Sequence, residues 1–168
     1  GNSDLTSIRI TLPANAIIGD VLTISDGSST QTYVLTADDL VSGHYDTSVS
    51  KPSEGSTLTV TASLSDTAGN TSPSSSASAI LDTTVATPSV VLTTDSGSSA
   101  TDHYTNSGAL AIGDLESGAS VQYSTDGGQT WTNSFSAVEG ENTVAARQMD
   151  VAGNVSVATT LDFIVDTE

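Results

Sequence analysis

The chain has very few basic residues and no cysteine, and these absences exclude several classes of function. Its 168 residues include three Lys or Arg and 20 Asp or Glu, which gives a formal net charge of -17. Duplex nucleic acid and anionic membrane surfaces bind through clusters of basic side chains, so neither is an expected partner. Without cysteine the chain has no disulfide, no thiolate nucleophile and no zinc–sulfur site.

Long apolar runs and aromatic side chains are scarce as well. No apolar run approaches the roughly 20 residues that span a bilayer, so we expect no membrane insertion. The sequence opens at Gly1 on polar residues rather than on a signal peptide, and we expect it to be a piece of a larger protein. Aromatic residues make up 4% of the chain, which leaves few side chains to line a catalytic cleft. We predict that the protein is not an enzyme.

The apolar residues that are present follow the period of β-strands. Apolar and polar side chains alternate over residues 58–62 and 121–124, and residues 89–92 are largely apolar. Clusters of Gly, Asp, Asn and Ser separate such runs at intervals typical of a β-sandwich. No window carries the i, i+3, i+4 apolar stripe of a long helix. An acidic chain with few aromatics could be disordered, but this alternation predicts an all-β fold instead.

The chain also repeats itself. The sequence Asp-Thr-Ala-Gly-Asn at residues 66–70 returns as Asp-Val-Ala-Gly-Asn at residues 150–154, 84 positions later (150 − 66). In both copies an alternating strand precedes the turn, and a second strand that ends in Asp-Thr follows it. The segment 82–88, which ends in a proline, reads as a short linker. We therefore predict two domains, residues 1–84 and 85–168.

The two halves differ at their beginnings. The second half has residues 88–108 before its strand at 109–115, whereas the first has only residues 1–4 before the matching strand at 5–12. The first half carries additional residues around 37–50 instead. We expect domain one to lack its first strand, which would leave an unpaired edge. The alternative is that domain one is a shorter variant of the repeat.

Several motifs together resemble a known family. The repeated turns, the linker and residues 95–99 and 121–131 resemble bacterial immunoglobulin-like repeats of giant adhesins, which type I systems secrete and which often carry RTX repeats. The first half resembles a sister repeat type through residues 10–13, 19–27 and 35–40. The resemblance implies two tandem immunoglobulin-like β-sandwich domains joined by a short linker. Such modules are extenders on the bacterial cell surface, serve adhesion or biofilm formation, and stack on neighbouring repeats of the same chain with Ca²⁺ at or near the joints.

Strand directions in such a sandwich locate the candidate calcium ligands. Because they alternate, the turn with Asp150 and Asn154 should lie at the end of domain two that receives Asp82 and the linker. Glu116, in the turn after the second strand, should lie there too. Carboxylate and amide oxygens are the ligands that Ca²⁺ prefers, and the gathered carboxylates would repel one another without a cation. The alternative is that Asp-x-Ala-Gly-Asn is only a tight turn.

Five further residues are secondary candidates for metal ligands. Asp66 and Asn70 mark the corresponding end of domain one, and Asp166 should meet a following domain. Asp95 and Asp102, in the long first connection of domain two, should lie at the opposite end of that domain, near Asp166.

Other motifs favour structural roles. Residues 124–131 fit the Asp-box pattern Ser-x-Asp-x-Gly-x-Thr-Trp, which predicts a hairpin whose turn Asp126 ties together, with Trp131 packed beneath it. His44 and His103 lack metal-binding spacing and are expected in solvated loops. The leading hypothesis is a calcium-stiffened stalk whose host or surface ligand is bound by another domain. The alternatives are a module that binds a carbohydrate or protein through Trp131, Tyr104 and Tyr123, and an accessory module of a secreted hydrolase.

Overall fold

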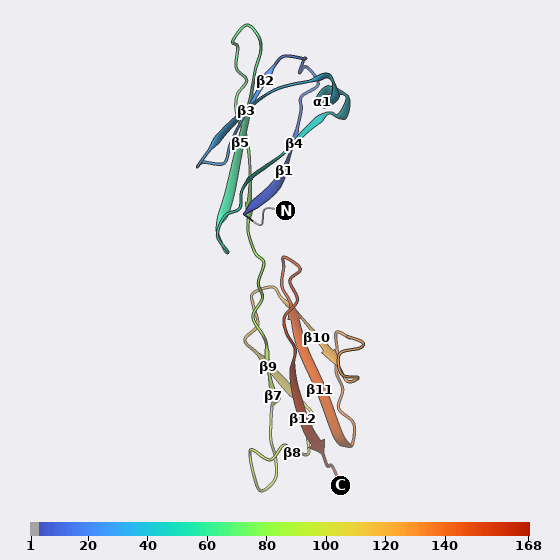
Figure 1. Cartoon of the computed structure of the whole chain (residues 1–168). Helices are drawn as coiled ribbons and strands as arrows, with labels where there is room; N and C mark the ends of the chain where they lie inside the picture. Colours follow the sequence, from blue (N-terminus) through green and yellow to red (C-terminus); the bar gives the residue numbers. More distant parts are fainter. Residues whose placement is uncertain (1–3) are drawn as a thin grey trace. The chain divides into compact units, whose positions relative to one another are not determined.

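The computed structural model describes residues 4–168 and confirms the all-β fold (Figure 1). Residues 1–3, which include the polar start of the sequence, lie outside the described part. The chain divides into two compact units, unit 1 over Gly1–Leu81 and unit 2 over Asp82–Glu168. The division falls close to the predicted boundary at Thr84, and it leaves the whole segment 82–88 with unit 2.

Unit 1 contains two antiparallel sheets. One pairs β1 (Leu5–Thr11) with β4 (His44–Ser50). The other has the order β3–β2–β5–β6, with β2 at Val21–Ser25, β3 at Thr30–Val34, β5 at Thr57–Ser65 and β6 at Ser75–Ile80. Alternating small apolar and hydroxyl side chains suit these strands, which have one inner and one wet face.

The additional residues of the first half form a short helix and a strand. The helix α1 (Ala37–Ser42) is the only helical element among residues 4–168. At its start, the backbone N–H of Thr36 donates to the Asp39 carboxylate at 2.8 Å. It ends at Gly43, whose φ of 71° lies in the left-handed region that favours glycine. The chain then enters β4, which supplies the partner of β1.

Unit 2 repeats this plan with a different first segment. Its four-stranded sheet has the order β10–β11–β12–β8, with β8 at Tyr104–Thr105, β10 at Ser120–Ser124, β11 at Gly140–Met149 and β12 at Thr159–Val165. The short strand β8 runs parallel to β12, whereas the other pairs are antiparallel. The second sheet pairs β7 (Ser89–Leu92) with β9 (Leu110–Gly113).

The repeated sequence corresponds to repeated topology. In unit 1, β5 lies between β2 and β6, and in unit 2 β11 lies between β10 and β12. In each unit the Asp-x-Ala-Gly-Asn turn follows this central strand. The matching strands predicted at residues 5–12 and 109–115 are β1 and β9. Their partners differ, because β1 pairs with β4 and β9 pairs with β7. Among the described residues of unit 1, no strand takes the place of β7.

The two cores differ in how completely they are covered. In unit 2 the inward residues of β11 and β12 pack with Val90 of β7 and are all buried: Val144, Ala146, Leu161, Phe163 and Val165. In unit 1 the buried cluster consists of Leu22, Ile24 and Leu35. The inward residues of β5, among them Val60 and Ala62, are only half-buried. The central strand of unit 1 therefore contributes less burial than its counterpart in unit 2.

A matched pair of truncations tests this difference. Val144 and Val60 stand 84 positions apart at the same place in the repeat, but Val144 is 0% exposed and Val60 is half-buried. We expect Val144→Ala to lower the free energy of unfolding of unit 2 by about 2 kcal/mol and Val60→Ala to lower that of unit 1 by less than half as much. Scanning calorimetry of both variants checks this, and equal losses would contradict it.

Candidate functional site

The Asp-x-Ala-Gly-Asn turn of unit 1 is held together by its own aspartate. One oxygen of Asp66, Oδ1, accepts hydrogen bonds from the backbone N–H groups of Ala68 at 2.9 Å and Asn70 at 2.8 Å. The other, Oδ2, accepts from Nδ2 of Asn70 at 2.8 Å. Gly69 has a φ of 90°, which explains the glycine at this position. These hydrogen bonds, foremost the one from the Asn70 side chain, hold the pKa of Asp66 below its usual value.

The copy in unit 2 has the same internal geometry and is more deeply placed. The backbone N–H of Asn154 donates to Asp150 Oδ1 at 2.8 Å, and its Nδ2 donates to Asp150 Oδ2 at 2.7 Å. Asp150 is 8% exposed. Burial raises the pKa of Asp150, but hydrogen bonds from the side chain and backbone of Asn154 and from neighbouring N–H groups outweigh it, and the pKa is lowered. Both copies therefore show the tight-turn geometry.

The turn of unit 2 also meets the beginning of its own unit. Nδ2 of Asn154 lies 3.2 Å from the backbone oxygen of Asp82 and 3.2 Å from its Oδ1. The structure thus brings together Asp82, Asp150 and Asn154, as the strand directions predict. The amide nitrogen of Asn154 faces these oxygens, whereas a metal ligand would present the amide oxygen. Several acceptors gather there, and only the NH₂ group of the amide supplies donors to them.

The carboxylate of Glu116 contacts the backbone of the same segment. One oxygen of its carboxylate accepts the N–H of Ala86 at 2.6 Å. The backbone N–H of Glu116 in turn donates to Oε1 of Gln148 at 3.0 Å. Nε2 of Gln148 donates to the carbonyls of Ala86 at 2.8 Å and Asp114 at 3.0 Å. Ala86, in the segment that enters unit 2, is therefore hydrogen-bonded at both its N–H and its C=O.

Gln148 is the residue of this network that the sequence interpretation missed. It is 0% exposed and lies on the inward face of β11, two positions after Ala146. A buried amide requires partners for its donors and its acceptor, and Gln148 finds them in three backbone groups. The available signal was a polar residue on the apolar face of an alternating strand, at the position where the first repeat has Leu64.

These residues have the chemistry of a hard-cation site. The carboxylates of Asp82 and Asp150 and the backbone oxygen of Asp82 all lie within hydrogen-bonding distance of the side-chain amide of Asn154. Rotation of the Asn154 amide would present its oxygen, and such oxygens suit Ca²⁺. Within residues 4–168, no group of three or more His, Cys, Asp or Glu side chains is placed to hold a metal ion. The fit therefore depends on amide and backbone oxygens in addition to the carboxylates.

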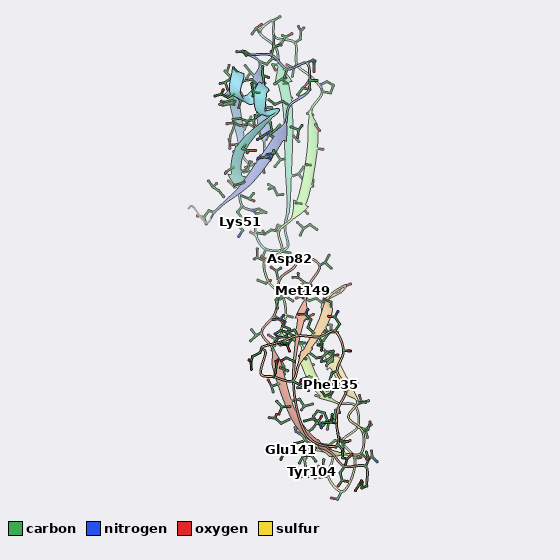
Figure 2. All side chains as sticks on the ribbon, turned by 90° about the vertical axis from the view of Figure 1, so that its right-hand side faces the viewer. Lys51, Asp82, Tyr104, Phe135, Glu141 and Met149 are labelled. Carbon is green, nitrogen blue, oxygen red and sulfur yellow. The ribbon has the colours of Figure 1, made fainter. Side chains whose placement is uncertain are left out.

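The secondary candidates lie elsewhere. In unit 2, Asp82 and Met149 lie at one end, and Tyr104 lies at the other (Figure 2). At that end, the carboxylate of Asp102 accepts the backbone N–H of Tyr104 at 3.2 Å, and the carboxylate of Asp95 accepts the backbone N–H of His103 at 3.1 Å. The backbone N–H of Asp166 donates to Thr105 at 2.9 Å. The structure thus brings the loop with Asp95 and Asp102 beside the strand end that leads to Asp166, as predicted, and separates all three from Asp82.

The Asp-box forms the predicted hairpin. Oδ1 of Asp126 accepts from Oγ of Ser124 at 2.7 Å and from the N–H groups of Gln129 and Thr130, both at 2.9 Å. Nε1 of Trp131 donates to the carbonyl of the turn at Gly128, at 3.0 Å. These contacts confirm that the motif ties a turn.

The three aromatic residues proposed as a binding platform have separate surroundings. The ring of Trp131 lies under the guanidinium of Arg147, with Cζ 3.9 Å from the ring centroid. Tyr123 packs against Phe135, with 6.2 Å between ring centroids. Tyr104 is 54% exposed and lies on β8. Two of the three side chains are therefore engaged in packing within unit 2.

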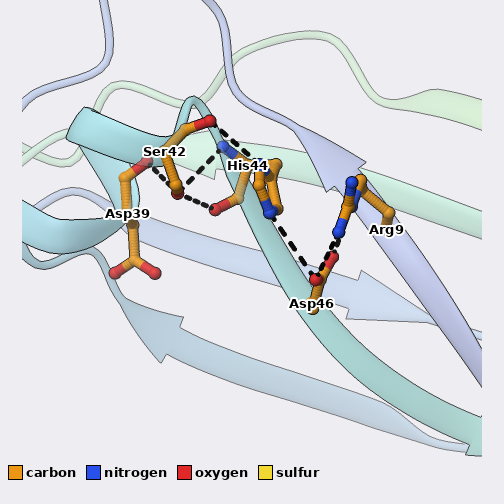
Figure 3. A network of polar contacts seen from close by, with 5 residues as sticks. All are labelled: Arg9, Asp39, Ser42, His44 and Asp46. Atoms are coloured by element: carbon orange, nitrogen blue, oxygen red, sulfur yellow. Dashed lines mark hydrogen bonds and ion pairs between the residues drawn. The ribbon is translucent and has the colours of Figure 1, made fainter.

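Unit 1 has a polar network on the pair β1–β4 (Figure 3). Nε and Nη2 of Arg9 each lie 2.8 Å from a carboxylate oxygen of Asp46, its cross-strand neighbour. Nε2 of His44 is 3.5 Å from the same carboxylate, and its Nδ1 contacts the carbonyl of Ser42. Hydrogen bonds from Arg9 hold the pKa of Asp46 below its usual value. The expectation that His44 lies in a solvated loop is wrong, because this residue begins β4; the network joins two strands at the surface.

No protein-family model matches the chain, and no curated protein matches it. Among the described residues no helix has the length and apolar character required to cross a bilayer.

Solved structures of three other proteins are similar to the chain. Fibronectin(III)-like modules of Clostridium thermocellum CbhA align with 97% of this chain and 86% of theirs, at 16% identity and a TM-score of 0.49. A 1.5-MDa bacterial ice-binding adhesin aligns with 98% of this chain and 59% of its own, at 17% identity and 0.47. The FN1–FN3 domains of chicken CNTN1 align with 94% and 62%, at 10% identity and 0.41. At these identities the likeness concerns the fold alone.

The hydrogen-bonded aspartates generate a prediction for acid stability. The hydroxyl and N–H of Thr130, with further donors, hold the pKa of Asp126 well below its usual value. A pKa lowered by folding contributes stability that is complete above the unfolded value of about 3.9 and is lost as the pH falls from there through the folded value. We expect Asp126→Asn to lower the melting temperature of unit 2 at pH 7 and to lower it less at pH 3. Fluorescence of Trp131, the sole tryptophan, reports this transition; an equal effect at both pH values would contradict the prediction.

Proposed function

We propose that this chain is a non-catalytic extender segment of a bacterial surface adhesin, in which Ca²⁺ stiffens the polypeptide that enters unit 2. The observation that carries the proposal is the meeting of Asp82, Asp150 and Asn154 at the start of that unit. A cation bound there would connect the entering segment to the turn that follows the central strand. The proposed role is mechanical, since the ion would fix backbone that otherwise depends on a few hydrogen bonds.

The proposed ligands come from three places in unit 2. Asp82 offers its carboxylate and its backbone oxygen, and the turn offers Asp150 and the amide oxygen of Asn154. Glu116 offers a further carboxylate, which already accepts the N–H of Ala86 in the entering segment. Ca²⁺ takes six to eight oxygen ligands in flexible geometry and accepts backbone and amide oxygens alongside carboxylates. Its charge would offset the repulsion among these acids in a chain of net charge -17.

The non-catalytic part of the proposal is supported by how the reactive side chains are used. The Asp-box aspartate holds a turn. His44 contacts Asp46 at a strand edge, and His103 contacts the backbone oxygen of Asp162 at 3.1 Å. Asp39 and the Thr36 N–H form part of a helix start. Each of these groups has a structural partner that accounts for its position.

Calorimetric titration with Ca²⁺ tests the site directly. We expect the wild-type chain to bind Ca²⁺ at a site that Asp82→Ala weakens at least about tenfold and that Asp82→Ala combined with Asp150→Ala abolishes, because one and then two carboxylate ligands are lost. The single variant matters because Asp82 is exposed and takes no part in the tight turn. Asp38→Ala combined with Glu141→Ala removes the same charge from α1 and from the far end of β11, and serves as the control. Identical isotherms for wild type and both site variants would refute the calcium site.

The mechanical role has its own measurement. Ca²⁺ should slow hydrogen exchange at the N–H groups of residues 82–87 and raise the melting temperature of unit 2, and EDTA should reverse both effects. In Asp82→Ala neither effect should appear. Binding without slower exchange in this segment would leave a calcium site but overturn its stiffening role.

A further inference from the structure

Unit 1 has an open apolar groove on its inner face. It has a volume of about 1170 Å³ and lies between β1 on one side and β5 and β6 on the other. Most of the apolar side chains that line it come from these three strands, among them Ile8, Ile10, Leu58, Val60, Ala77 and Ala79. Ala77 and Ala79 are exposed although they lie on strand β6 of the main sheet.

Unit 2 shows what occupies the same place in the repeat. Val60 and Ala62 correspond to Val144 and Ala146, which lie 84 positions later in the repeat. Val144 and Ala146 are each 0% exposed. Their cover includes Val90 of β7, which belongs to the same buried cluster, and β7 contacts β12 directly. Ala77 likewise corresponds to Leu161, which is buried. In unit 2, therefore, an extended strand closes the space that is open in unit 1.

The edges of the groove are available for strand pairing. β1 pairs with β4, and β6 pairs with β5; within residues 4–168 neither strand has a partner on its other edge. In unit 2 the corresponding strands β9 and β12 are paired at those edges by β7 and β8. Unpaired backbone N–H and C=O groups along an edge pair readily with an added strand.

Polar groups at one end of the groove also suit an incoming chain. Asp20 lines the groove and is 4% exposed. Its Oδ2 accepts the N–H of Ile17 at 3.0 Å, but its Oδ1 has no hydrogen-bond partner among the described residues. Asp66 and Asn70 line the same groove, and their counterparts in unit 2 meet the chain at Asp82, before it becomes β7. A buried acceptor without a donor is costly, and the backbone or a hydroxyl group of an added strand would supply one.

We propose that this groove is a binding site for an extended polypeptide strand, which pairs with the edge of β1 and inserts alternate apolar side chains over β5 and β6. The occupant has the chemistry of residues 82–92: an aspartate, a short extended segment with proline, and a strand with apolar residues two apart, as Val90 and Leu92 are. Binding completes unit 1 as β7 completes unit 2. The site is independent of calcium, and its test does not involve the metal.

The probe is a synthetic peptide of residues 82–95, added to the full chain and followed by calorimetry and by backbone amide NMR. We expect one peptide to bind per chain, with shifts confined to unit 1, at β1, β5 and β6. Unit 2 should be unaffected, because its own segment is covalently attached and outcompetes a free peptide. A peptide with Val90→Asp and Leu92→Asp should bind at least about tenfold more weakly, since it would bury charges in an apolar groove.

Two protein variants locate the site. Ala77→Asp places a carboxylate in the groove at an exposed position and should reduce peptide affinity about tenfold or more. Val41→Asp, on α1 at 89% exposure and outside the groove, should leave it unchanged. Circular dichroism verifies that both variants fold. Absence of peptide binding, shifts in unit 2 alone, affinity unchanged in Ala77→Asp, or self-association through the groove seen by sedimentation would each overturn the proposal.

Discussion

The covering of the central strand is the constraint on which both units depend. A strand in the middle of a sheet presents alternate side chains inward, and these contribute to stability only when another layer excludes water from them. In unit 2 the segment before β9 provides that layer, and Val144 is inaccessible to solvent. In unit 1 the partner of β1 is β4, which follows α1 in the chain, and the face of β5 is left half-covered. The same repeat thus has a closed and an open form in one molecule.

A second principle is the use of side-chain carboxylates in place of backbone acceptors. Asp66, Asp126 and Asp150 each accept several N–H groups of their own turn, which lowers their pKa values. Turns of this kind need a glycine with positive φ and a short acceptor side chain. In a chain of net charge -17, these acids therefore shape the backbone. Part of the negative charge therefore serves to hold turns together, without any bound cation.

The start of unit 2 combines both principles. Gln148 takes an inward position of β11 that the repeat otherwise gives to Leu64, and it uses that buried position to hold the entering backbone at Ala86. Asp150 takes part in a tight turn and contacts the amide that reaches Asp82. The entering segment is consequently attached to the central strand and to the turn after it.

Much of this could be predicted from the sequence because local backbone chemistry determines it. Period-two alternation identified the central strands, and a short apolar run identified β7. The repeated Asp-x-Ala-Gly-Asn predicted two similar turns, and the Asp-box predicted its hairpin, since each depends on residues within a few positions of one another. The tertiary structure alone decided that Asn154 presents its nitrogen to Asp82, that Gln148 is buried against backbone, that His44 begins a strand and that β5 is left half-covered. Those outcomes depend on which distant segments meet, and a hydrogen bond or a covering strand leaves no periodic pattern in the residues that receive it.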